Sequence, residues 1–466
     1  MLVEAAGETL TGNSSLDLVL GTAEPPFRTL ILEASVPHWF NVEIVARLAP
    51  GREVLLEDLK SLPFVRSHAQ GYAFHDDVRA DLRLALIRDD PERVREISRE
   101  LFVAIGENDA NQDEVTPEGI YLALAFDEEH ALPNLDKAIE SARSGGQLNV
   151  TDTLVHLAEE QMPLLTEYGQ EMIRYYRGLL AMDMRAWEMG AAVFASIKLT
   201  RLSAHFATRS QLNWGYCIEK SGHWRESRDH YEALLKGIRG VEITESTRAT
   251  LHERLAEVYL VLRNLKRAER HGKQGLAVNQ KLQNRLGEAV SLHILGVIRE
   301  KLHDLSTASS LLHASLELFR SLGRQQEESR VWNDLGAISL TAANPARARE
   351  GFEQAQKLKV VLGDNYGLAF VYANLGKLAI AESGDFERAE SYYTSSLALF
   401  RQFRDRLNSA RILRNVALVH ELQGHSSEAA EQMSEALSTL PDDSPLAGLY
   451  QRGLERLQRL ASKRHE

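Results

Sequence analysis

A pattern of large and small apolar residues recurs about every 40 residues from residue 166 onward. The clearest copy is VWNDLGAISLTAANPARAREGFEQA, residues 331–355, in which Trp332, Leu335 and Gly336 share one helical face and Ala348 and Phe352 share a second. This spacing predicts two amphipathic helices in each unit, joined by a short turn. The equivalent positions in the neighbouring units are Leu292, Leu295, Gly296, Ala308 and Leu312, and then Tyr372, Leu375, Gly376, Ala389 and Tyr393.

The small residues of this pattern indicate how the helices pack. Glycine or alanine on each helix lets paired backbones approach closely, while the larger residues form one buried stripe. A single pair cannot bury its own apolar face, so neighbouring pairs must stack. We therefore expect a solenoid with a concave surface over residues 166–440.

The repeated residues resemble the tetratricopeptide repeat (TPR) pattern, and the unit of about 40 residues resembles the longer-helix variety of that family. The resemblance implies a mainly α protein built as a right-handed superhelix of TPR-like helix pairs. Residues 91–165 also have helical patterns, but without clear repeat spacing, so we interpret them as a helical arm or as degenerate repeats.

Residues 441–466 predict a helix with one apolar stripe, formed by Leu446, Leu449, Leu454, Leu457 and Leu460. The open end of a solenoid needs a cover, so we interpret this segment as a capping helix. A helix lying on a membrane surface is the alternative, but the segment has little basic face.

Residues 25–90, which follow a leading segment at 1–24, predict a different order of elements. Helices are expected over 25–35, 40–49 and 53–62, strands at 64–68 and 71–75, and a closing helix over 76–87. This order resembles the winged-helix domain of the signal-transduction ATPases with numerous domains (STAND). The matching residues are Leu62, Phe64, Val65, Gly71, Tyr72, Phe74, His75 and Asp76.

The STAND resemblance implies a winged helix that follows a nucleotide-binding core and precedes a sensor made of repeats. It makes His75, the histidine after the hairpin, a candidate relay residue; a locally hydrogen-bonded histidine is the alternative. The sequence departs from that family because it contains no G-x-x-x-x-G-K-[ST] loop to hold nucleotide phosphates. The chain would then be the C-terminal part of such a switch or a stand-alone descendant, with a separately encoded ATPase or effector among its partners.

The charge of the predicted winged helix argues against DNA as a partner. Residues 25–90 contain eight Arg and Lys against ten Asp and Glu, a balance of −2. The helix that would enter a DNA groove, GREVLLEDLKS at 51–61, is itself acidic. Phosphate contacts require positive charge, so packing against another protein domain is the favoured role.

Composition narrows the class of protein further. The 466 residues carry a net charge of −12, which disfavours wholesale binding to nucleic acid or to anionic membranes. Cys217 is the single cysteine, so we expect a small buried residue and no disulfide. The first twelve residues lack the basic start and apolar run of a secretory signal, and no stretch is apolar enough to span a membrane. These features predict a cytoplasmic protein.

Catalytic and metal-binding motifs are not evident. The nearest metal-like pair is Asp127 and His130 in FDEEH, which we interpret as a polar helix end because no third ligand accompanies it. The sequence therefore predicts a non-enzymatic protein with no cofactor and no metal.

The concave surface is the better candidate for function. In each unit, positions at fixed offsets from the small residue of the first helix should face inward. Asparagine side chains there would bond a peptide backbone, and arginine and lysine would pair with carboxylates; an inner face that carries only water is the alternative. The candidate groove residues are Arg330, Asn333, Asn374, Lys377, Arg411, Arg414 and Asn415, with Arg209, Asn213, Glu253, Glu257, His293 and Phe370 at the remaining inward positions.

Together, these features predict a TPR sensor or scaffold that recognises a protein or peptide in its groove, as part of a STAND-like signalling system. The alternative is a winged-helix transcriptional regulator controlled by a peptide bound to the repeats. A third interpretation is the regulatory part of a separately encoded enzyme.

Overall fold

The computed structural model describes residues 14–108, 116–238, 241–441, 444 and 446–462. The chain divides into two compact units, residues 1–202 and 203–466. This boundary falls inside the segment predicted as the array. The first twelve residues, interpreted above as lacking a secretory signal, lie outside the described residues, as do the last four of the predicted capping helix.

The first unit begins with a small domain of helices and one hairpin. The predicted order is present, preceded by a helix inside the leading segment whose Leu16 and Leu20 are buried in the core of the domain. That helix was not predicted. The elements are α1 (Ser14–Thr22), α2 (Pro25–Glu33), α3 (Val42–Leu48), α4 (Leu55–Lys60), β1 (Val65–His68), β2 (Gly71–Phe74) and α5 (Asp76–Asp89).

The predicted hairpin is confirmed. Strands β1 and β2 pair antiparallel with Val65 opposite Phe74, and Tyr72 also exchanges backbone hydrogen bonds of 2.7 and 2.9 Å with Phe40. A side chain at Gly71 would clash with the carbonyl oxygen of Phe40, and its φ of +146° also favours glycine. The hairpin is thus attached to the segment between α2 and α3.

The rest of the first unit is helical. Helix α7 packs on α6, α8 and α9, and α10 packs on α8, α9 and α11. The first turn of α8 is acidic, and Pro133 lies inside the helix, five residues after its first residue, Glu128. The elements are α6 (Pro91–Asn108), α7 (Pro117–Phe126), α8 (Glu128–Ser144), α9 (Leu148–Gln161), α10 (Glu167–Asp183) and α11 (Trp187–Ser196), with short 3₁₀ turns at Met162–Leu164 and Leu199–Arg201.

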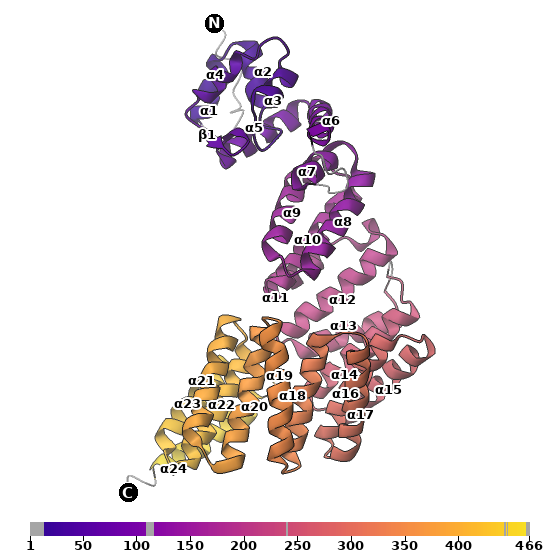
Figure 1. Ribbon diagram of the computed structural model, residues 1–466, viewed down its shortest axis with the longest axis vertical. Coiled ribbons are helices and arrows are strands. Elements are labelled where there is room, and N and C mark those ends of the chain that lie inside the picture. Colours follow the sequence, from indigo (N-terminus) through magenta and orange to yellow (C-terminus); the bar gives the residue numbers. More distant parts are fainter. Residues whose placement is uncertain (1–13, 109–115, 239–240, 442–443, 445, 463–466) are drawn as a thin grey trace. The chain divides into compact units, whose positions relative to one another are not determined.

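The second unit is a stack of antiparallel helix pairs, coloured pink to yellow in Figure 1. The predicted superhelix of TPR-like pairs is confirmed. Its helices are α12 (Ala204–Lys220), α13 (Trp224–Lys236), α14 (Glu245–Val261), α15 (Leu265–Lys281), α16 (Arg285–Lys301), α17 (Leu305–Ser321), α18 (Gln325–Thr341), α19 (Pro345–Val361), α20 (Asn365–Ser383), α21 (Phe386–Gln402), α22 (Arg406–Leu422) and α23 (Ser426–Thr439), followed by α24 (Ala447–Ser462).

Close packing within a pair depends on the small residues that define the repeat. A Cβ added to Gly336 on α18 would lie 2.6 Å from the ring of Phe352 on α19, and one added to Gly351 would lie 2.8 Å from the backbone of Gly336. Ala348 is also fully buried. At the end of the stack, Tyr450, Leu454 and Leu457 of α24 join the core of the last pair.

The turns of the second unit follow a strict rhythm. One residue in the left-handed conformation follows each helix from α14 to α22, and these residues recur every 20 or 21 positions. Five of the nine are not glycine, so the geometry of the array imposes this conformation on ordinary side chains. They are Arg263, Gln283, His303, Gly323, Ala343, Gly363, Gly384, Arg404 and Gly424.

Candidate functional site

The first helices of consecutive pairs form the inner layer of the array. Helix α14 packs on α16, α16 on α18, and α18 on α20, in addition to the contacts of each helix with its own partner. Because these helices are the ones that converge, their outward-facing residues line a concave surface. We call this surface the groove.

Three of the predicted groove residues form a hydrogen-bonded chain. The side-chain amide of Asn374 on α20 donates to the amide oxygen of Asn333 on α18 at 3.0 Å, and the Lys377 ammonium donates to the amide oxygen of Asn374 at 3.1 Å. Thus Asn333 and Asn374, which are 41 residues apart in the sequence, are in contact in the inner layer.

The remaining predicted cations are exposed on the same set of helices. On α22, Arg411 donates to the side-chain oxygen of Asn408 at 3.2 Å and Arg414 donates to that of Asn415 at 3.3 Å. Arg330 is exposed on α18. Within the described residues, none of these arginines, nor Lys377, forms an ion pair with a carboxylate.

Two of these cations have pKa values below their usual range. Desolvation by surrounding protein lowers the pKa of Lys377, and the like charges of Lys301, Arg414 and Arg411 lower it further while Glu300 raises it. Desolvation also lowers the pKa of Arg411. Both side chains are nevertheless exposed to solvent, so they remain accessible to a ligand.

The part of the groove between α12 and α16 differs from the part on α18, α20 and α22 because its charged side chains are paired with one another. Glu257 accepts a hydrogen bond of 2.8 Å from Arg254, and opposite charges on Arg254 and Lys220 help to hold the pKa of Glu257 below its usual range against desolvation. Arg254 and Lys220 each lie 5.0 Å from the centre of the Tyr216 ring. This half of the groove is electrostatically balanced.

The prediction that Glu253 faces the groove is wrong. Its side chain is buried between helices and accepts hydrogen bonds from Asn279 on α15 at 2.8 Å and from Ser291 on α16 at 2.7 Å. Burial raises its pKa to about 7. Glu253 therefore connects helices within the array.

Other inward positions have structural partners. His293 lies 2.7 Å from a carboxylate oxygen of Asp334, which joins α16 to α18. The Phe370 ring packs edge-on against Phe400 at 4.8 Å between ring centres, so it contributes to the core. Arg209 and Asn213 lie on α12 and are half-buried.

Sequence reasoning missed several charged groove residues. Lys220, Arg254, Arg263 and Lys301 lie on or just after the first helices of their pairs. A signal was present for two of them, because Lys220 and Lys301 each follow the small glycine of their unit by five residues. These positions fall beyond the offsets used to define the predicted groove.

His75, the predicted relay residue, lies in an exposed position before the first turn of α5, where its backbone nitrogen donates to Phe64 at 2.9 Å. A different histidine occupies a polar network of the first unit. His38 lies 2.8 Å from a carboxylate oxygen of Glu118 on α7 and 3.5 Å from one of Glu160 on α9.

This network connects the small domain to the helical arm. Arg79 of α5 is 5% exposed and contacts Glu160, the hydroxyl of Tyr121 and the carbonyl of Ser35. Arg83 donates to the backbone oxygen of Glu160 at 2.7 Å, and Tyr121 donates to the carbonyl of Val36 at 2.8 Å. We call this set, with Gln161, the Tyr121 network.

The electrostatics of the Tyr121 network favour the charged forms of its members. Burial opposes protonation of His38, but hydrogen bonds to Glu118 and Glu160 outweigh it and raise the His38 pKa. Burial likewise opposes ionisation of Glu160, yet His38 and Arg79 lower its pKa to about 2. The network is therefore a set of mutually neutralising charges.

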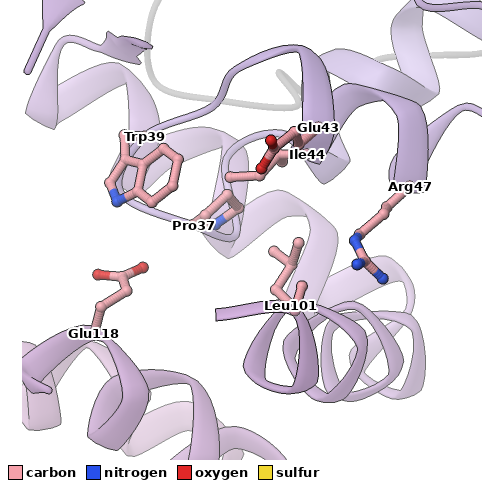
Figure 2. A pocket seen from close by; sticks show the side chains of 8 residues that line it. Pro37, Trp39, Glu43, Ile44, Arg47, Leu101 and Glu118 are labelled. Atoms are coloured by element: carbon pink, nitrogen blue, oxygen red, sulfur yellow. The ribbon is translucent and has the colours of Figure 1, made fainter. Parts of the chain in front are cut away.

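A small pocket is lined in part by Glu118 of this network, and Figure 2 shows its lining residues. Trp39 and Glu118 border one side of it and Arg47 borders the other. Glu118 is already engaged by His38, so the remaining charged groups of the lining are Glu43 and Arg47. The lining residues are Pro37, Trp39, Glu43, Ile44, Arg47, Leu101, Ala104 and Glu118.

Other reactive groups have ordinary structural roles. Cys217 is buried, and burial raises its pKa to about 12, which suits the small core residue that was predicted. His130 pairs with Asp127 at 2.9 Å on the exposed start of α8. Among the described residues, no group of three or more His, Cys, Asp and Glu side chains has the geometry of a metal site, and no helix is both long and apolar enough to cross a bilayer.

The comparisons with known proteins identify the repeats. A tetratricopeptide repeat family model matches residues 367–442, which cover α20 to α23. The fold is similar to that of a Rap protein complexed with competence and sporulation factor, with 14% identity over 81% of this chain and 96% of that chain and a TM-score of 0.53. No protein with curated function matches the sequence.

Two further solved structures are similar at lower scores. One is a STAND protein with a tetratricopeptide repeat sensor from Pyrococcus horikoshii, with 15% identity over 96% of this chain and 61% of that chain and a TM-score of 0.47. The other is aspartyl phosphate phosphatase F from Bacillus subtilis, with 13% identity over 76% and 91% and a TM-score of 0.46. At these identities the similarity is one of fold.

Proposed function

We propose that this chain is a non-enzymatic TPR sensor or scaffold that binds a protein or peptide ligand in its groove. The observation that carries the proposal is the row of exposed cations and side-chain amides on α18, α20 and α22. Amides can bond the backbone of an extended peptide, and arginine and lysine can pair with its carboxylates.

The proposal extends to the role of the small domain. The Tyr121 network holds α5 of that domain to α7 and α9 of the arm through buried charges. A domain attached in this way moves with the arm. We therefore propose that it docks onto a neighbouring protein, such as a separately encoded ATPase or effector of a STAND-like system, and relays the state of the array.

The proposed groove can be tested by affinity capture with the full chain. We expect wild-type protein to retain a partner that the double variant Arg411→Glu, Arg414→Glu loses, because two exposed cations become anions at the same site. The matched control is Lys266→Glu, Lys357→Glu, which makes the same charge change at exposed positions on α15 and α19. The same set of captured partners for all three proteins would contradict the proposal.

Transcriptional regulation through DNA is the second candidate function. Helix α4 has only six residues and carries Glu57 and Asp58 in its first turn, which disfavours contact with phosphates. A titration with random duplex at low salt tests this directly. Micromolar binding that weakens steeply with added salt would favour the regulator over the scaffold.

A further inference from the structure

Contacts within the second unit show that the array curves back on itself around α18. At its ends, Pro441, in the segment after α23, lies against Gly222 in the turn after α12, where an added Cβ would be 3.2 Å from the proline ring. Closer to the middle, Arg263 after α14 interacts electrostatically with Arg411 on α22, and Lys301 of α16 does so with Lys377 on α20. The three pairs are nested, with α18 at their centre.

The nested pairs bring like charges together. Arg263 and Lys301 belong to the wall formed by α14 and α16, while Lys377, Arg411 and Arg414 belong to the wall formed by α20 and α22. We call these five residues the cationic cluster. Each pair across the groove is therefore repulsive rather than attractive.

Few carboxylates offset this charge. Lys301 pairs with Glu300 at 2.9 Å, and Asp405 lies near Arg411 but already accepts a hydrogen bond from Tyr366 at 2.7 Å. In the part of the chain that the structure describes, the other four cations form no ion pair. Elsewhere in the same array, Arg299, Arg320, Arg349, Arg401 and Arg456 each pair with a glutamate.

Unpaired cations are unexpected in a chain with a net charge of −12. Carboxylates are abundant, and arginines of the array usually find them. Five cations that converge from two walls and remain largely unneutralised define a surface whose electrostatic complement is an anion.

We infer that the cationic cluster binds an acidic segment of a partner protein, with at least two carboxylates that bridge the two walls. This inference rests on the proposed groove function and adds the chemistry of the ligand. Bridging carboxylates would replace repulsion between the walls with attraction, so ligand binding would also hold the curved array closed. The amides of Asn333 and Asn374 lie beside the cluster and can bond the backbone of such a segment.

A nucleic acid is the less suitable polyanion. Glu257 and the buried Glu219 lie in or beside the half of the groove formed by α12 and α14, where each pairs with a cation. The charges of that half are already balanced, so it offers a continuous phosphate backbone no net attraction. An acidic peptide segment can place its carboxylates at the cationic cluster and present neutral or basic residues to the other half.

The test is selection of random peptides of about ten residues, long enough to cross several helix pairs when extended, displayed against the full chain. We expect enriched peptides to carry two or more Asp or Glu residues. A synthetic copy of an enriched peptide should bind at least about tenfold more weakly to Lys377→Gln, Arg411→Gln than to wild type, since each lost charged hydrogen bond is substantial. Replacement of the acidic residues of the peptide by Asn and Gln should have a similar effect.

Controls separate this inference from the groove proposal. The variant Lys266→Gln, Lys357→Gln should bind the peptide as wild type does, and thermal melts should show that all variants fold. Enriched peptides without acidic residues, or equal binding by Lys377→Gln, Arg411→Gln, would overturn the acidic ligand but keep a peptide groove. Tighter binding of an oligothymidine of equal charge would also overturn it, and failure to enrich any peptide would overturn both proposals.

Discussion

The Tyr121 network and the cationic cluster are both rich in charged side chains, but they differ in how those charges are satisfied. In the network, Arg79, Glu160 and His38 are largely buried and neutralise one another. In the cluster, Lys377 and Arg411 are exposed, and their near neighbours include charges of the same sign. The first arrangement stabilises a fold, whereas the second costs stability and is suited to a ligand.

The largest expected effect is the loss of one partner in the Tyr121 network. Arg79→Met should destabilise the first unit by up to about 3–5 kcal/mol, because the mostly buried Glu160 would lose its arginine partner and keep only its 3.5 Å contact with His38. Hydrogen exchange of peptides from α5 and α9 measures the local free energy of opening.

The matched control for Arg79→Met is Arg66→Met. Arg66 pairs with Asp76 at 2.8 Å in the same small domain, but both side chains are exposed. The free energy of unfolding should therefore fall by less than about 1 kcal/mol. Equal effects of the two changes would mean that the network has no special role in joining the domain to the arm.

The second effect is a loss of folding stability at low pH. The folded-state pKa of Glu160 is about 2 and its unperturbed value is 4.5, so its contribution is present above pH 4.5 and is lost as pH falls towards 2. That contribution is about 3 kcal/mol at neutral pH by linkage. Glu160→Gln should therefore flatten the stability profile across that window, as measured by urea unfolding at each pH. A profile that stays as steep as in wild type would contradict this assignment.

The third effect has the opposite sign and lies in the array. Glu253 has only neutral hydrogen-bond donors, and its folded-state pKa is about 7. The folded state therefore binds more protons than the unfolded chain between pH 4.5 and 7, and stability falls as pH rises through this range. Glu253→Gln should increase stability above pH 7 by about 1–3 kcal/mol, whereas Glu317→Gln at an exposed position of α17 should not. A gain that does not depend on pH would reject the explanation.

The smallest effect should come from the cationic cluster in the absence of ligand. Lys377→Gln, Arg411→Gln should leave the free energy of unfolding within about 0.5 kcal/mol of wild type, or raise it slightly, because repulsion is relieved and no ion pair is lost. Urea unfolding of the ligand-free chain measures this. A marked loss of stability would show that these cations are structural, and the contrast with the Tyr121 network would disappear.

The sequence predicted those features that depend on local periodicity. The helix pairs, the hairpin and the close approach at Gly336 follow from residue spacing alone, because each repeat packs mainly on its neighbours. The sequence did not predict that Glu253 points between helices, because a shift of one residue along a helix decides whether a side chain faces the groove or the next helix. The helix at Ser14–Thr22 was missed because its leucines are too few to establish a period.

The Tyr121 network could not be predicted in the same way. Arg79 and Glu160 are 81 residues apart and meet only because α5 and α9 pack in one unit. No local pattern marks such a pair, and His75 had the stronger sequence signal although His38 has the contacts. Partners that depend on long-range packing require the structure.

The regular left-handed residues at 20 or 21-residue intervals, together with the nested pairs around α18, limit how this array can change in length. An inserted helix pair would fit the local packing of its neighbours at any turn. If it lay between Lys301 and Lys377, it would nevertheless shift one wall relative to the other by one unit, so Lys301 would no longer face Lys377 and Gly222 would no longer meet Pro441. Duplication of a repeat, usually the easiest change for a solenoid, would here exchange one set of facing residues for another and thereby alter the charges that the proposed groove presents to a ligand.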